Sequence, residues 1–199
     1  EWIKFDSGGD VNTAVIAGSV DLGLACSSPV TRGLSKPLNI PYQVLWIHDV
    51  IGDNEALVVR NEVGASSVAD LKGKKIAAPF ASTTHYSLLA ALADANLSAS
   101  DVTLVDLEPQ DIQAAWTRGD IDAAYVWTPV LSELKKDGTV LVTSRELAAD
   151  GKATYDLGVV RTAFAEEHPE IVTGWHKMFV LDDPPDYEPG PEKSFAAIA

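Results

Sequence analysis

The sequence has 199 residues and is strongly acidic, with 29 aspartates and glutamates against 15 lysines and arginines and a formal net charge of −14. Such a surface repels phosphate backbones, so we expect no nucleic acid among its partners, and any anion site must be local and preorganised. An apolar fraction of 46% is typical of a globular chain, and no uninterrupted apolar run approaches the roughly 18 residues of a membrane span.

The cysteine and histidine content gives no sign of a metal centre. Cys26 is the single cysteine, which excludes an internal disulfide and any cysteine-based metal framework. Its small neighbours in the sequence favour a packing role. The histidines show no metal-ligand spacing with one another. We therefore expect no metal and no cofactor.

The pattern of apolar residues predicts strands and helices in alternation along the chain. Gly18 ends one predicted helix, and Ser28 followed by Pro29 marks the start of another. The predicted strands are 2–5, 21–25, 42–47, 55–59, 75–78, 102–107, 121–126, 140–143 and 156–161. The predicted helices are 11–17, one that starts at 27–29, a short one at 66–71, 84–96, 111–118, 129–136, and a pair over 163–179 that is interrupted at 168–169. This alternation is typical of a parallel, doubly wound α/β architecture.

The segment 78–89 is a candidate anion-binding loop, because a predicted buried strand is followed by Ser82, Thr83 and Thr84 at the start of a predicted helix. The first backbone N–H groups of a helix have no acceptor inside it, and the helix dipole adds partial positive charge there, so this end can hold a small anion. Serine and threonine are also the ordinary N-caps of helices, which is the alternative interpretation. A second hydroxyl-lined helix start follows a strand at 27–29. In open α/β sheets such ends gather on the side where ligands bind.

Segments 18–23 and 119–124 have a similar pattern, in which a helix-ending glycine is followed by an acid and a strand of small residues. Two lobes of similar topology would explain this similarity. We expect a first lobe over 1–58, a second lobe over 59–155, and a return toward the first lobe over 156–199. The tail at 181–191 is rich in proline and acidic residues, which predicts an exposed or irregular segment.

With these features in place, the chain resembles the periplasmic substrate-binding proteins of ABC importers, in their sulfonate, nitrate and taurine branch. The similarity runs from about residue 1 to about residue 180, and it implies the two-lobed type II fold, with each lobe a doubly wound sheet flanked by helices. The segments that carry it are 4–8, 27–29, 54–59, 82–92, 114–116, 118–122 and 125–127.

The ends of the sequence depart from this resemblance. Family members begin with a strand and a helix that would precede residue 1, and they continue with helices beyond residue 199, so we expect the sequence to be a fragment that lacks both ends. No signal-peptide pattern opens the chain. The acidic, proline-rich residues 182–191 also differ from the helical continuation that the family would suggest.

The resemblance implies a monomeric binding protein rather than an enzyme, periplasmic or lipid-anchored outside the cytoplasmic membrane. Such a protein captures taurine or a related sulfonate between its lobes and delivers it to an ABC permease and its ATPase. Taurine carries a sulfonate and an ammonium, so its site needs hydrogen-bond donors at one end and a carboxylate or an aromatic face at the other. The candidate donors are Ser27, Ser28, Thr83, Thr84 and His85. The candidate partners of the ammonium are Glu55, Asp156, Tyr125 and Trp127, for which core packing or a solvated carboxylate is the alternative.

Three other functions stay open at this stage. A carrier for alkanesulfonates or another small oxyanion would need the donors but no carboxylate. An enzyme of the same architecture, like the thiamine-pyrimidine synthases, would need cysteine and histidine motifs that one cysteine in a packing context supports weakly. The ligand-sensing half of a transcription regulator would need an attached helix-turn-helix. No Gly-x-Ser-x-Gly elbow surrounds any serine, and we expect no catalytic residue.

Overall fold

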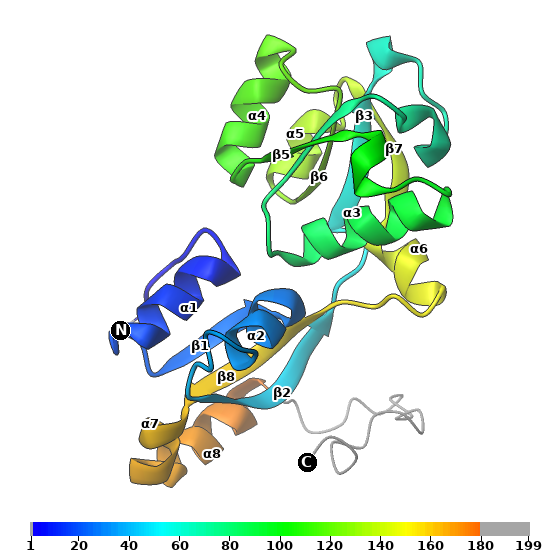
Figure 1. Cartoon of the computed structure of the whole chain (residues 1–199). Coiled ribbons are helices and arrows are strands. Elements are labelled where there is room, and N and C mark those ends of the chain that lie inside the picture. Colours follow the sequence, from blue (N-terminus) through cyan, green and yellow to red (C-terminus); the bar gives the residue numbers. More distant parts are fainter. Residues whose placement is uncertain (1, 180–199) are drawn as a thin grey trace.

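The structure, a computed structural model, describes residues 2–179, with side chains up to Trp175, and these residues form two lobes with one β-sheet each (Figure 1). Strands and helices alternate along the chain, as predicted. The α/β class and the two-lobed architecture are therefore confirmed. The tail predicted to be irregular, 181–191, lies outside the described residues.

The first lobe holds an antiparallel sheet of three strands in the order β1-β8-β2. The strands are β1 (Leu22–Cys26), β2 (Tyr42–Val50) and β8 (Tyr155–Arg161). Helices α1 (Gly8–Ile16) and α2 (Ser27–Leu34) cover one face, and α7 (Thr162–Glu167) and α8 (Pro169–Phe179) lie on the other (Figure 1). Val11, Val15, Val30 and Val159 form the centre of the core under α1 and α2.

The second lobe holds a mixed sheet of five strands in the order β5-β4-β6-β3-β7. The strands are β3 (Glu55–Arg60), β4 (Lys75–Ala78), β5 (Thr103–Asp106), β6 (Ala123–Trp127) and β7 (Gly138–Thr143). The helices are α3 (Thr83–Asp94), α4 (Pro109–Arg118), α5 (Val130–Leu134) and α6 (Ser144–Ala149), with short 3-10 turns at Asn61–Val63, Val68–Leu71 and Ala99–Asp101. The sheet therefore has helices on both faces, as a doubly wound sheet requires.

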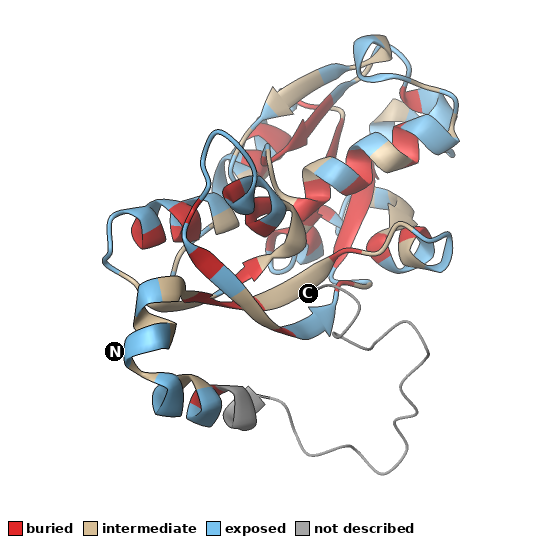
Figure 2. Cartoon of the chain, turned by 60° about the horizontal axis from the view of Figure 1, so that its bottom comes forward, coloured by how far each residue is buried: buried red, intermediate tan, exposed pale blue. Residues whose placement is uncertain are grey.

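Alternation along β3 explains how one strand serves both faces of this sheet. Ala56 and Val58 pack toward α4 and α5, while Leu57 and Val59 pack toward α3 and α6. Successive side chains of a strand point to opposite faces, so Glu55 shares the α3 side with Leu57 and Val59. Figure 2 shows buried residues on the side of α3 that faces the sheet and exposed residues on its outer side.

The prediction of parallel sheets was wrong for most strand pairs. Among the described strands only β4 pairs in parallel, with β5 and β6, whereas β3 is antiparallel to β6 and β7, and β8 is antiparallel to β1 and β2. The cause is the path of the chain. Strands β3 and β8 enter their sheets from the other lobe instead of through a crossover helix within one sheet, so they run against their neighbours.

Three local predictions also need correction. Residues 2–5 form no strand, and the side chains of Trp2 and Ile3 are exposed. Helix α2 begins two residues earlier than the Ser28-Pro29 signal suggested, with Cys26 rather than a serine as its N-cap. Helix α6 was not predicted, although its capping box, in which Thr143 and Glu146 satisfy each other's backbone N–H groups, is a local signal.

The chain crosses between the lobes twice, through residues 51–54 and through 150–154. The N–H of Ile51 donates to the carbonyl of Thr154 at 3.0 Å, which holds the two crossing segments together. Because β3 belongs whole to the second sheet, the first crossing precedes the predicted lobe boundary at residue 58. The division into domains at 58 and 155 stays a prediction. Within residues 2–179, no helix combines the length and the apolar character that a membrane crossing requires.

Candidate ligand-binding site

A cavity of about 420 Å³ lies where the two lobes meet and takes its lining from both. The N-cap residues of three helices line it: Ser7 of α1, Cys26 of α2 and Ser82 of α3. Ser7 Oγ accepts from the N–H of Asp10, and Ser82 Oγ accepts from the N–H of His85. The first N–H groups of a helix have no acceptor within it and carry partial positive charge. Three helix dipoles therefore favour negative charge in one cavity.

Glu55 is the most buried acid that lines this cavity, with 3% of its surface exposed. It opens β3 on the side that faces α3 and α6, so hydroxyls from both helices reach it. Thr83 Oγ1 donates to Glu55 Oε1 at 2.9 Å, and Ser144 Oγ lies 3.3 Å from Glu55 Oε2. Burial raises the pKa of Glu55 to about 7, and the charge of Asp156 adds to the rise, while the hydroxyls of Thr83 and Ser144 oppose it.

Tyr125 extends these hydrogen bonds deeper into the second lobe. Its hydroxyl lies 3.0 Å from Ser144 Oγ, which links Tyr125, Ser144, Glu55 and Thr83 into one buried chain. The Tyr125 side chain has no exposed surface, and burial raises its pKa. Tyr125 thus supports the wall of the cavity from behind.

The opposite wall comes from the first lobe. Asp156 lies at the start of β8 and pairs in register with Cys26 of β1. Burial and the nearby Asp156 carboxylate raise the pKa of the Cys26 thiol. Trp127 lies beside Glu55 across the β3–β6 pair. None of the described residues that line the cavity is a lysine or an arginine, so N–H and O–H groups must satisfy a bound anion.

The structure brings four of the nine predicted site residues together: Glu55, Thr83, Trp127 and Asp156 all line the cavity. Three others, Ser27, Ser28 and His85, line a neighbouring groove between α2 and α3 instead. Thr84 and Tyr125 have no exposed surface and line neither the cavity nor this groove. Contact of any of the nine residues with a ligand stays a prediction.

Four of the five that do not line the cavity have other partners in the structure: Tyr125 has Ser144, and Thr84 Oγ1 lies 2.7 Å from Ser82 Oγ. Ser27 Oγ accepts from the N–H of Tyr155 at 3.2 Å, which connects α2 to the start of β8. The His85 ring stacks on Phe80 with centroids 4.3 Å apart, and its Nδ1 accepts from the N–H of Ala81. Burial lowers the pKa of His85, which favours the neutral imidazole.

Sequence reasoning missed the contribution of α1. Asp6, Ser7 and Gly8 line the cavity, and the Ser-x-x-Asp spacing of Ser7 and Asp10 was a local signal for a helix start. Gly8 allows this approach, because a Cβ there would lie 2.4 Å from Pro29 Cγ. Cys26, expected to pack in the core, and His48 also belong to the lining. No group of three metal-ligating side chains is found in the described part of the chain.

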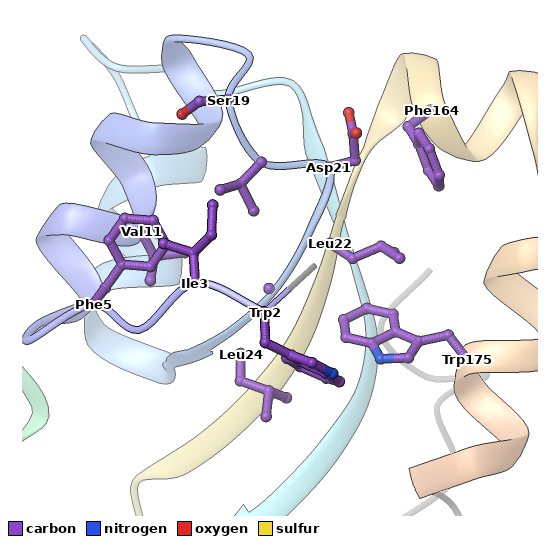
Figure 3. A pocket seen from close by; sticks show the side chains of 12 residues that line it. Trp2, Ile3, Phe5, Val11, Ser19, Asp21, Leu22, Leu24, Phe164 and Trp175 are labelled. Atoms are coloured by element: carbon purple, nitrogen blue, oxygen red, sulfur yellow. The ribbon is translucent and has the colours of Figure 1, made fainter.

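A larger hollow of about 650 Å³ lies on the first lobe, between residues 2–5, β1 and helices α7 and α8 (Figure 3). Its walls are mostly apolar, with Trp2, Phe164 and Trp175 around the opening. Asp21 is the one charged residue in its described lining, and it pairs with Arg161. This hollow therefore lacks the converging polar groups of the cavity between the lobes.

Comparison with known proteins relates the chain to transport. A family model described as the substrate binding domain of ABC-type glycine betaine transport systems matches residues 1–184. The chain is 45% identical over 180 residues to the taurine-binding periplasmic protein of Escherichia coli (strain K12), covering 90% of this chain and 55% of the relative. It is 33% identical over 180 residues to a putative aliphatic sulfonates-binding protein of Bacillus subtilis (strain 168), covering 90% and 53%.

A solved structure shows the same architecture. The alkanesulfonate-binding protein SsuA of Xanthomonas axonopodis pv. citri, bound to MOPS, superposes with a TM-score of 0.77 at 27% identity, covering 87% of this chain and 59% of that protein. The neighbouring folds are type II periplasmic binding proteins, as expected. The chain spans about half the length of the curated relatives it matches.

Proposed function

Because this chain belongs to the family of substrate-binding domains of ABC-type transport systems, we propose that it captures taurine in the cavity between its lobes and presents it to a membrane permease. The permease and its ATPase are the proposed protein partners, and the periplasm, or the outer side of the cytoplasmic membrane through a lipid anchor, is the proposed location. The proposed protein is a monomer and a carrier, not an enzyme.

One observation carries the choice of ligand: three helix N-termini and three carboxylates, those of Asp6, Glu55 and Asp156, line the same cavity. Helix N-termini and hydroxyls suit the three oxygens of a sulfonate. The carboxylates of Glu55 and Asp156 suit an ammonium, and Trp127 can add an aromatic face. The cavity volume of about 420 Å³ lies in the range of small-molecule sites.

The burial of Glu55 supports taurine over a simple alkanesulfonate, which is the second candidate. A buried carboxylate without a cation is unfavourable, and an incoming anion adds repulsion. A ligand that brings its own ammonium relieves both effects. The sulfonate names of several relatives support the anionic half of the ligand, and the acids Glu55 and Asp156 support the cationic half.

The experiment is a thermal melt of the full-length protein with taurine, ethanesulfonate, glycine betaine or sulfate. A ligand at 100 times its Kd stabilises the native state by about 2.7 kcal/mol, which raises the melting temperature by several degrees. We expect a clear rise with taurine and a smaller one with ethanesulfonate. Sulfonate buffers such as MOPS must be left out. Equal rises with taurine and ethanesulfonate would favour the alkanesulfonate carrier, and no rise with taurine would refute the proposal.

A further inference from the structure

We propose that the Glu55 carboxyl holds a proton in the empty cavity and exchanges it for the ammonium of the ligand, with Thr83 and Ser144 as the residues that position it. This inference rests on the proposed function and goes beyond it, because it makes capture a proton exchange. The proton passes from Glu55 to bulk water or buffer as the cation takes its place, so the charge of the carboxyl site stays constant.

The geometry supplies the first argument. Glu55 lies at the inner wall of the cavity, with one carboxyl oxygen 2.9 Å from Thr83 Oγ1 and the other 3.3 Å from Ser144 Oγ. Each hydroxyl can donate to a carboxylate, and Ser144 can also accept from a carboxylic acid, because a hydroxyl has both a proton and lone pairs. Tyr125, 3.0 Å from Ser144, can donate or accept in turn. These hydroxyl groups can therefore satisfy the hydrogen-bonding capacity of the Glu55 side chain both as a carboxylate and as a carboxylic acid.

The charges around Glu55 supply the second argument. The groups facing it include Asp156 of β8, whose charge raises the pKa of Glu55, and Cys26 of β1, a thiol that burial keeps protonated. The remaining titratable groups in the described lining are Asp6 and His48. No described lysine or arginine lines the cavity to neutralise a second carboxylate. Burial and this environment together raise the pKa of Glu55 to about 7.

The pH dependence follows directly. With a pKa of about 7, Glu55 is about 90% protonated at pH 6 and about 10% at pH 8. Binding of taurine should therefore release about 0.9 proton at pH 6 and about 0.1 at pH 8, and the apparent Kd should fall about tenfold between them. Ethanesulfonate lacks the cation, so its binding should release no proton at either pH.

The test is calorimetric titration of the full-length protein with taurine and with ethanesulfonate, from pH 6 to pH 8, in phosphate and in imidazole. These buffers differ in ionisation enthalpy, so the difference in observed heat gives the number of protons released. The variant Ser144→Ala removes a donor that favours the charged carboxylate, and it should shift the release profile to higher pH. The matched control is Ser132→Ala on the exposed side of α5, which should leave the profile unchanged.

The outcomes separate this inference from the proposed function. Failure of taurine to bind refutes the proposed function. Taurine binding without proton release across this pH range refutes the exchange and leaves the function standing. Release of as many protons with ethanesulfonate also refutes the exchange, because no cation then replaces the proton. An unchanged profile in Ser144→Ala refutes the positioning role, and loss of release in Glu55→Gln supports Glu55 as the source.

Discussion

Replacing Glu55 with glutamine should make the ligand-free protein more stable at alkaline pH. Glutamine keeps the shape of the side chain and an oxygen that accepts from Thr83, but it carries no charge. One pKa unit corresponds to about 1.4 kcal/mol. The rise from the usual 4.5 to about 7 therefore means that ionising the buried carboxyl destabilises the native state by about 3 kcal/mol.

The sign and the pH window follow from the raised pKa. The stability that Glu55 contributes is fully present below about pH 4.5 and is lost as the pH rises through about 7. Glutamine does not titrate. The free energy of unfolding of the variant, relative to that of the wild type, should therefore rise by about 2.5 kcal/mol between pH 5 and pH 8. Other titrating groups cancel in this comparison, because both proteins carry them.

The assay is urea unfolding of both ligand-free proteins at pH 5, 6, 7 and 8. Glu166→Gln on α7, where the side chain is exposed, is the control, and its difference from the wild type should not change over this range. A difference between Glu55→Gln and the wild type that is equal at pH 5 and pH 8 would refute the reasoning, because it would mean that burial does not disfavour the Glu55 charge.

Two further substitutions test the walls of the cavity. Gly8→Ala should lower the free energy of unfolding by about 1–3 kcal/mol, since its Cβ would lie 2.4 Å from Pro29 Cγ. Gly9→Ala, whose Cβ meets its nearest atom at 3.5 Å, should be neutral or stabilising, and equal urea midpoints for the two variants would contradict this packing. Thr83→Val should destabilise the protein by about 1–3 kcal/mol at pH 8 and by less at pH 5, because it removes a donor to the ionised Glu55. Equal losses at both pH values, measured by urea unfolding, would count against this role.

The sequence was sufficient for the parts of the fold that depend on local patterns. Ser82 caps α3 as its position before an apolar helical run predicted, and the alternation of strands and helices matches the structure closely. Strand direction was not predictable in this way. It depends on the two crossings between the lobes, which bring β3 and β8 into their sheets from the far side, and no local pattern records that path.

The candidate site shows the same division between local and long-range information. Tyr125 and Trp127 lie two residues apart on one face of β6, so the sequence pattern alone does not show which of them reaches the cavity. Only Trp127 lines the cavity, because Ser144 and α6 cover Tyr125. Ser7 carried a local cap signal, but its place in the cavity depends on how α1 packs against Pro29.

Cys26 gives the cavity a native attachment point for a chemical label. It is the only cysteine in the sequence, it caps α2, and it lines the cavity. Because burial and the Asp156 carboxylate hold its thiol in the protonated form, alkylation by a maleimide should be slow at neutral pH. A ligand in the cavity would cover the sulfur and slow the reaction further. The rate of labelling at this one atom can therefore be read as occupancy, without any engineered cysteine.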